Sequence, residues 1–405
     1  MECYIKPKIY YLTRSYHPYQ KGGGPLMRNG AVKYLQELGY EVIVVMPNYN
    51  NRDFIIENNI WQIPFKGKYI QKLVSFLERI GFYEDYLDKW VCNAFEYLKD
   101  KVSQNDIVFA TSGGELGTIK LGSILKNKFK IAQIYYKSCR FIINLHDPID
   151  YTLVHGKKLN TKFHISREAQ EQKYLSNSDL IITSSKSNQT SLISKYPEFK
   201  DKIKCNYFGY IEKINIVGNR YQKSNKLKIA YIGNMSATQK PEILYQAYKR
   251  LSKKENIEIY FIGNYKNYKP LCNIYESNVH LIDFMPHKEL LKFMTENIDI
   301  GFVSLANDYL GACVPSKIYE YINLELPMIG ALPSGDGMEI INNNNYGIAC
   351  KYYDTEGISD AILKFSDKLF LEKIRNNIID DKHLWAMSLK IKEVDLLLKE
   401  LIYEN

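Results

Sequence analysis

Short apolar runs recur along this chain, and each ends in a polar or glycine-containing loop that leads toward a helical pattern. The clearest runs are residues 8–12, 41–47, 106–111, 141–145, 180–183, 227–233, 258–263, 279–284 and 298–305. Uninterrupted apolar runs of this length are typical of strands that are buried on both faces of a parallel sheet. Strands that alternate with helices in this way predict right-handed βαβ units, and therefore an α/β fold.

The length of the chain and a polar segment near its middle predict two domains. With 405 residues, of which 45% are hydrophobic, the chain is too long for one ordinary core and can fill two. Residues 215–226 are polar and basic, and the strand pattern starts again directly after them. We expect two Rossmann-like domains, 1–215 and 216–385, that face each other across a cleft. Residues 386–405 form a final helix that could cross back to the first domain.

Charge and cysteine content exclude several classes of protein. The net charge of +9 suits an anionic substrate or membrane surface, but no basic stripe with interleaved aromatic residues predicts nucleic-acid binding. The seven cysteines are scattered and include no Cys-x-x-Cys pair, which argues against disulfides and zinc. No secretory leader and no apolar run of the ~20 residues that span a bilayer are evident. A cytoplasmic protein is expected, with attachment to the inner face of a membrane as a further option.

Residues 311–331 combine the features of an anion-binding loop with a carboxylate. Pro315 and Ser316 open a predicted helix, whose amino-terminal N–H groups and dipole favour a negatively charged ligand. Lys317 adds a full positive charge there, and Glu320 follows one turn later on the same face, where it could accept hydrogen bonds from sugar hydroxyls. The alternative is an ordinary βα connection in which Lys317 and Glu320 form a solvated pair, because such pairs are common on helices.

The amino-acid sequence of this stretch gives evidence beyond the spacing of Lys317 and Glu320. Val-Pro-Ser-Lys-Ile-Tyr-Glu-Tyr-Ile followed by Leu-Pro-Met-Ile-Gly resembles the donor-binding signature of glycosyltransferase family 4, in its Pro-Ser-Lys subgroup of bacterial surface-polysaccharide enzymes. The resemblance implies a retaining enzyme with the two-domain GT-B fold, in which the Glu binds the ribose of the nucleotide. The commoner version of the signature has a second Glu eight residues earlier, where this chain has Ala312.

The resemblance also implies which residues of the second domain hold the donor. Family members usually place Arg and Lys after the first strand of this domain, and the corresponding residues here are Asn234 and Gln239, with Lys240 one residue further on. The turn 285–287 resembles the turn that faces the nucleotide base. The expected donor-binding residues are Gly233, Asn234, Gln239, Lys240, Gly263, Met285, His287, Pro315, Ser316, Lys317 and Glu320. No metal or other cofactor is expected, because positive side chains can replace a metal at a diphosphate.

Polar residues in the first domain mark a second expected site. Gly23 and Gly24 belong to a triple glycine that lets backbone approach a ligand, but G-x-G-x-x-G is absent, and a plain flexible turn is the alternative. Glu115, His146 and Asp147 follow strands at the edge where open α/β sheets bind ligands. We expect Gly23, Gly24 and Glu115 to bind the acceptor, and His146 and Asp147 to be catalytic. The resembled subgroup usually has Arg where His146 stands, and His is mostly uncharged at neutral pH.

The segment 66–99 is helical in pattern and carries a basic amphipathic stretch at 68–82. Packing on its own domain would explain the apolar face, and contact with anionic lipid is the alternative, because basic amphipathic helices with aromatic residues suit membrane surfaces.

Together these features favour a glycosyltransferase that moves a sugar from a nucleotide-diphosphate sugar to a hydroxyl of a glycan or lipid-linked acceptor. UDP is expected because it is the commonest nucleotide among the resembled enzymes. A nucleotide-sugar 2-epimerase on the same fold and a non-catalytic partner subunit remain alternatives, and Ala312 and Asn234 favour the latter. A dehydrogenase is less consistent with the sequence, because neither glycine loop has the dinucleotide fingerprint.

Overall fold

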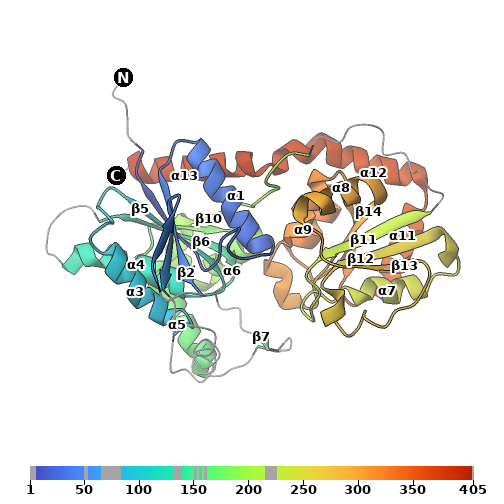
Figure 1. The fold of residues 1–405 in the computed structure, drawn as a ribbon, viewed down its shortest axis with the longest axis horizontal. Helices are drawn as coiled ribbons and strands as arrows, with labels where there is room; N and C mark the ends of the chain where they lie inside the picture. Colours follow the sequence, from blue (N-terminus) through green and yellow to red (C-terminus); the bar gives the residue numbers. More distant parts are fainter. Residues whose placement is uncertain are drawn as a thin grey trace. The chain divides into compact units, whose positions relative to one another are not determined.

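The computed structural model contains two compact units (Figure 1). It describes residues 6–49, 53–64, 84–131, 138–149, 153–154, 157–158, 162–214 and 226–403. Unit 1 comprises Met1–Tyr207 and Lys390–Asn405, and unit 2 comprises Phe208–Leu389. The predicted amphipathic stretch 68–82 and most of the predicted linker 215–226 lie outside the described residues.

Unit 1 is built on an eight-stranded sheet in the order β10-β9-β6-β5-β1-β2-β4-β3. All neighbouring strands are parallel except β3 and β4, which form an antiparallel hairpin. The strands are β1 (Ile9–Leu12), β2 (Val42–Asn48), β3 (Ile55–Glu57), β4 (Ile60–Pro64), β5 (Ile107–Gly113), β6 (Arg140–Asp147), β9 (Leu180–Thr183) and β10 (Ile203–Cys205). A separate pair consists of β7 (Leu153–Val154) and β8 (Lys157–Lys158).

Helices of unit 1 connect these strands and bury an apolar face against the sheet. They are α1 (Gly23–Glu37), α3 (Asp88–Leu98), α4 (Gly117–Ile131), α5 (Lys162–Asn177), α6 (Lys186–Lys195) and the 3₁₀ turn η1 (Pro197–Lys202). Helix α1 buries Val32 and Leu35, as its apolar periodicity predicts, and ends before Gly39 at φ +91°. Ser185 caps α6 by accepting a hydrogen bond from the backbone N–H of Asn188 at 3.1 Å.

Unit 2 is built on a fully parallel six-stranded sheet in the order β13-β12-β11-β14-β15-β16. The strands are β11 (Leu227–Gly233), β12 (Ile257–Gly263), β13 (Val279–Ile282), β14 (Ile300–Ser304), β15 (Met328–Leu332) and β16 (Gly347–Lys351). Numbered from its first strand, the order is 3-2-1-4-5-6, that of a Rossmann-type sheet. The sheet reverses its order between β11 and β14, and ligands bind at the carboxyl ends of strands beside such a switch point.

In the described part of unit 2, six helices and four 3₁₀ turns accompany this sheet. They are α7 (Glu242–Lys249), η2 (Lys254–Asn256), η3 (Tyr265–Asn267), α8 (His287–Asn297), η4 (Asp308–Ala312), α9 (Ser316–Asn323), α10 (Asp336–Asn343), α11 (Thr355–Phe365), α12 (Lys368–Asp381) and η5 (Lys382–Trp385). The final helix α13 (Met387–Tyr403) contributes its residues from Lys390 onward to unit 1. There Asn206 donates a hydrogen bond to Glu393 at 2.7 Å, and Tyr40 donates one to Asp395 at 2.8 Å.

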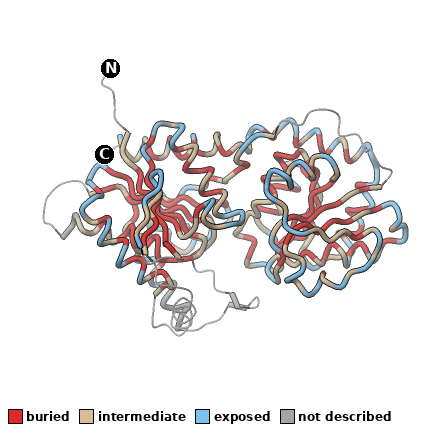
Figure 2. Tube along the Cα trace, in the orientation of Figure 1, coloured by how far each residue is buried: buried red, intermediate tan, exposed pale blue. Residues whose placement is uncertain are grey.

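Each sheet is the centre of its own hydrophobic core. The strands are buried over most of their length and the loops are exposed (Figure 2). Burial on both faces explains why the strand sequences are continuously apolar rather than alternating. The prediction of a two-domain α/β fold with parallel sheets is therefore confirmed. Within the predicted helical segment 66–99, the described part 84–99 is helical only over α3, because residues before Asp88 form turns.

Candidate active site

Lys317 lies over the carboxyl end of β11, at the switch point of unit 2. If Gly233 had a Cβ atom, it would lie 3.5 Å from Cε of Lys317. The ammonium group donates a hydrogen bond to Oε1 of Gln239 at 3.0 Å and lies 4.8 Å from the centroid of the Tyr231 ring. The hydroxyl of Ser304 donates to the carbonyl of Gln239 at 2.6 Å. Residues from β11, the loop after it, β14 and α9 therefore meet at one edge of the sheet.

The charge of Lys317 is not matched by a nearby carboxylate. Among the residues that the structure describes, no acidic oxygen lies within ion-pair distance of this ammonium group. Lys317 is partly buried, and this burial lowers the pKa of its amine from 10.5 to about 8. At neutral pH most of the amine is still protonated. The site therefore holds a partly desolvated positive charge, which is suited to bind an anion.

A tyrosine side chain holds α9 over the switch point. Tyr321 donates a bifurcated hydrogen bond to the carbonyls of Phe302 at 2.9 Å and Ala230 at 3.3 Å, which ties the helix to β14 and β11. Pro315 stands at the N-cap position, one residue before the helix, rather than in its first turn as we expected. The first N–H groups of α9, beginning with Ser316, therefore point out of the helix with a favourable dipole.

Glu320 and His287 meet on the same face of unit 2. Oε1 of Glu320, on α9, lies 3.4 Å from Nε2 of His287, the first residue of α8. This hydrogen bond raises the pKa of His287, although burial acts in the opposite direction. The other carboxylate oxygen of Glu320 is buried and has no hydrogen-bond partner. A buried, unpaired acceptor of this kind is costly, so it marks a place where a ligand hydroxyl fits.

Other predicted donor residues lie on the loops around this edge. Asn234 is exposed, and its carbonyl accepts a hydrogen bond from Tyr231 at 2.6 Å. Lys240 follows Gln239 with φ +46°. Gly263 ends β12 with φ +151°, and a Cβ there would lie 2.0 Å from the carbonyl oxygen of Gly233, so glycine is required.

Met285, a further predicted donor residue, and a glycine-rich loop also have defined positions in unit 2. Met285 is partly buried in the turn before α8. The glycine-rich loop 333–337 starts helix α10, with Gly335 at the N-cap, and a Cβ on Gly311 would lie 2.1 Å from the carbonyl oxygen of Ser334. Glycine at this position lets the loop before α9 and the loop before α10 pack against each other.

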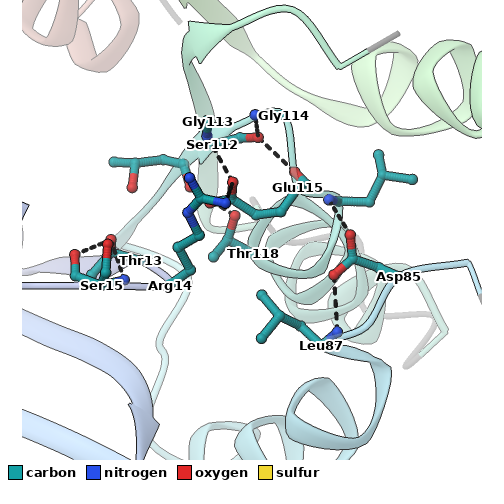
Figure 3. A network of polar contacts seen from close by, with 12 residues as sticks. Thr13, Arg14, Ser15, Asp85, Leu87, Ser112, Gly113, Gly114, Glu115 and Thr118 are labelled. Atoms are coloured by element: carbon teal, nitrogen blue, oxygen red, sulfur yellow. Dashed lines mark hydrogen bonds and ion pairs between the residues drawn. The ribbon is translucent and has the colours of Figure 1, made fainter. Parts of the chain in front are cut away.

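The switch point of unit 1 carries a second group of charged residues (Figure 3). Arg14 is the second residue after β1, and Nη1 of its guanidinium lies 3.3 Å from Oε2 of Glu115. The same oxygen accepts the backbone N–H of Gly113 at 2.8 Å, and the backbone of the loop is fixed by a hydrogen bond from Leu116 to Asp85 at 2.7 Å. Glu115 is only 2% exposed, and its Oε1 has no hydrogen-bond partner.

A β-bulge at the end of β6 brings Asp147 to this group. The register between β5 and β6 shifts from Ser112 opposite Leu145 to Gly113 opposite Asp147, and His146 lies at the bulge. Nε2 of His146 lies 3.0 Å from Oδ1 of Asn144. Burial, followed by the positive charges of Arg28 and Arg14, lowers the pKa of His146 well below its usual value. His146 is therefore neutral at physiological pH.

Glycines at the start of α1 lie close to Arg28. Gly23 and Gly24 open the helix and are exposed, and a Cβ on Gly24 would lie 3.5 Å from Nη1 of Arg28. Two arginines that were not predicted from the sequence, Arg14 and Arg28, thus lie among the predicted residues Gly24, Glu115, His146 and Asp147. Arg14 follows a strand at the same edge as His146, and Arg28 interrupts the apolar face of α1 four residues before Val32. These two sequence positions could have identified both arginines as candidate site residues.

Two other properties bear on the expected chemistry. Within the described ranges, no group of three or more His, Cys, Asp or Glu side chains is arranged to hold a metal ion. None of the helices that the structure describes is long and apolar enough to cross a bilayer.

Comparison with solved structures defines the class of fold. Anabaena HepE, in complex with UDP and glucose, superposes with a TM-score of 0.65 at 14% identity, over 97% of this chain and 100% of HepE. The lipopolysaccharide outer core galactosyltransferase WaaB superposes with a TM-score of 0.66 at 13% identity, over 98% of this chain and 99% of WaaB. The trehalose 6-phosphate synthase of Burkholderia multivorans superposes with a TM-score of 0.68 at 9% identity, over 98% of this chain and 96% of the synthase. At such identities the likeness establishes the fold, which is the GT-B fold of glycosyltransferases.

A match to a protein-family model gives independent evidence on the second unit. Residues 215–381 match the family described as Glycosyl transferases group 1. This part of the chain is therefore similar to a glycosyltransferase domain, and the expectation of an enzyme of the glycosyltransferase class is confirmed. A search of curated proteins finds no match.

Proposed function

We propose that the protein is a retaining glycosyltransferase that transfers a sugar from a UDP-sugar to a hydroxyl group of a glycan or lipid-linked acceptor. The observation that carries the proposal is the pair of unmatched groups on α9, the ammonium of Lys317 and the buried Oε2 of Glu320, both beside the switch point of unit 2. One is positive and the other negative, as a diphosphate and a sugar diol require.

The donor would lie across α9 with its diphosphate at the start of the helix. Lys317 would contact the phosphate oxygens together with the N–H groups of Ser316 and Lys317, because helix amino termini favour phosphate. Glu320 would accept hydrogen bonds from the ribose hydroxyls through Oε2. The base would then lie toward the turn 285–287, because His287 is already in contact with Glu320.

Catalysis would rest mainly on the leaving group. When the bond between the anomeric carbon and the β-phosphate oxygen breaks, the electron pair stays on that oxygen, and negative charge grows on the diphosphate. Lys317 and the helix dipole would stabilise this charge in a partly desolvated setting, where such interactions are strong. These groups would supply the positive charge that a metal supplies in other enzymes. His146 and Asp147 remain our candidates for contacts to the attacking acceptor.

The ligands and roles of structurally similar proteins support the finer parts of this proposal. HepE binds UDP and UDP-glucose, and WaaB acts in the outer core of lipopolysaccharide. A role in bacterial surface polysaccharide synthesis, such as that of capsule or lipopolysaccharide, at the cytoplasmic face of the membrane, is consistent with both and with the net charge of +9.

Calorimetric titration with UDP, GDP and ADP at pH 7 tests the donor site. Wild-type protein should bind UDP at micromolar concentration, and Lys317→Met should weaken this binding about 10- to 100-fold, since a hydrogen bond to a charged group contributes about 1.5–3 kcal/mol. Lys373→Met, an exposed lysine of α12, is the matched control and should bind as wild type does. Failure of all three nucleotides to bind would refute the donor site.

Turnover separates the enzymatic alternatives. Incubation of a UDP-sugar with candidate acceptors should give a product with retained anomeric configuration, with and without EDTA. Conversion of the UDP-sugar alone into an epimer, detected by NMR, would instead identify a 2-epimerase. Donor binding with neither reaction would favour the non-catalytic partner subunit.

A further inference from the structure

Arg28 is a buried cation that lacks an ion pair in the described part of the chain. It is 2% exposed, and no carboxylate among those residues lies within 4.0 Å of its guanidinium. Nη1 donates a hydrogen bond to Oγ of Ser15 at 2.6 Å, whereas Nε is buried without any partner. Burial of a charge without a counter-charge is strongly unfavourable, and a guanidinium has five N–H donors to satisfy.

Three charged groups converge on one point beside Gly113. The position that a Cβ of Gly113 would occupy lies 3.1 Å from Nη2 of Arg14, 3.3 Å from Oδ2 of Asp147 and 3.5 Å from Nη2 of Arg28. Because residue 113 is glycine, that position holds no side chain. The side of Gly113 that faces the two guanidinium groups and the carboxylate is therefore bare backbone, and no side chain of residue 113 separates these groups.

The two arginines differ in how their charge is compensated. Arg14 already has Glu115 as its ion-pair partner at 3.3 Å, and Arg14 is the more exposed arginine, with 37% of its side chain accessible. Burial and the fields of Arg28 and Arg14 keep His146 uncharged, so this ring adds no further positive charge. Asp147 can accept a hydrogen bond from a neutral hydroxyl, while Arg28 has free donors in the fork geometry that suits an oxyanion.

We propose that the acceptor sugar carries an oxyanion, a phosphate or a carboxylate, and that Arg28 and Arg14 bind this group while Asp147 accepts a hydrogen bond from a neighbouring sugar hydroxyl. The inference rests on the proposed transferase function and specifies its acceptor class. It is independent of the donor site, since all of its residues belong to unit 1.

The test uses the full chain saturated with UDP, so that the donor site is occupied before the acceptor probe is added. Calorimetric titration compares glucose 1-phosphate, glucuronate and glucose. At least one of the two anionic sugars should bind ten times or more tightly than glucose, and the better one identifies the oxyanion as phosphate or carboxylate. Arg28→Gln should remove this preference and leave UDP affinity unchanged, whereas Arg28→Lys should restore it only in part.

Controls separate a loss of recognition from a loss of structure. Arg140→Gln, at the amino end of β6 in the same sheet, should bind like wild type. If Arg28→Gln fails to fold, as judged by circular dichroism, Arg14→Lys is the substitute, because it keeps a positive charge beside the buried Glu115 and removes the guanidinium fork. This variant should bind the anionic sugar at least five times more weakly than the wild type does.

Three results would overturn the proposal. The first is that glucose and both anionic sugars bind with equal affinity, and the second is that neither anionic sugar binds. The third is that Arg28→Gln loses as much affinity for UDP as Lys317→Met does. The last result would place Arg28 at the donor. If the wild type does not bind UDP, the donor assignment fails, and the same titration without UDP still tests the anion site.

Discussion

Lys317 and Gln239 are 78 positions apart in the sequence, and Nζ of the lysine donates a hydrogen bond to Oε1 of the glutamine at 3.0 Å. A neutral amide thus occupies the place beside Lys317 where a carboxylate would have cancelled its charge. The contact orients the ammonium group at the switch point without neutralising it, which leaves the charge available for a phosphate. Several measurable consequences follow from this and three other local arrangements.

Replacement of Lys317 by Met should stabilise the protein at neutral pH. The pKa of Lys317 in the folded state is about 8, below its value of 10.5 when exposed, so folding disfavours the protonated form. This penalty is complete below pH 8 and disappears as the pH rises to 10.5. We expect Lys317→Met to raise the free energy of unfolding by about 1 kcal/mol at pH 7, or the Tm by about 2–4 °C for a unit of this size.

Thermal unfolding at pH 7 and pH 10 measures this effect. The difference between Lys317→Met and wild type should shrink at pH 10, and Lys373→Met should show no difference at either pH. A Tm gain that is the same at both pH values would contradict the assignment of a buried charge.

Replacement of Glu320 by Gln should lower the pKa of His287. The hydrogen bond from Glu320 raises that pKa in the wild type, so its contribution to stability is present at low pH and is lost as the pH rises through the raised pKa. NMR titration of the imidazole resonances measures the change, with the histidines outside α8 as an internal reference. An unchanged His287 pKa would show that the 3.4 Å contact is absent in solution.

Replacement of Gly263 by Ala should destabilise unit 2 severely. A Cβ there would lie 2.0 Å from the backbone oxygen of Gly233, and φ is +151°. Because backbone cannot move aside without displacing the end of β11, we expect a cost of about 3 kcal/mol or more. Gly39→Ala is the matched control in unit 1, since φ is +91° but no atom lies within 4 Å, and it should cost only about 1 kcal/mol. Equal losses in chemical denaturation would contradict the steric argument.

Replacement of Asp395 by Asn should weaken unit 1. Asp395 is 4% exposed and accepts hydrogen bonds from Tyr40 at 2.8 Å and Lys6 at 3.0 Å, with Lys399 at 2.7 Å. Burial opposes its ionisation, but these partners outweigh burial and lower its pKa. We expect a loss of about 1–3 kcal/mol at pH 7.

The pH dependence identifies the source of that loss. A lowered folded-state pKa means that the stabilisation is present above the unfolded value near ~3.9 and is lost as the pH falls through the folded value. The difference between Asp395→Asn and wild type should therefore disappear in acid. Glu400→Gln, an exposed position of α13, should be neutral throughout.

The strands were predictable because burial on both faces leaves a local signature. Residues 180–183 and 227–233 were predicted with the observed bounds, and 41–47 differs by one residue at each end from β2. The antiparallel hairpin of β3 and β4 was missed, although Asn58 and Asn59 both have positive φ, as a two-residue hairpin turn requires. That signal was weak because β3 is short and mostly exposed.

The alternation of strand and helix, the organisation into two units with parallel sheets and the placement of Lys317 and Glu320 on one helix all follow from the amino-acid sequence. These features depend on apolar periodicity and on contacts between residues a few positions apart. Tertiary structure alone decided that Gln239 accepts from Lys317, that Oε2 of Glu320 is unpaired, and that Arg14, Arg28 and Asp147 converge beside Gly113. Those arrangements join elements that are distant along the chain, and the order and register of the strands bring them together.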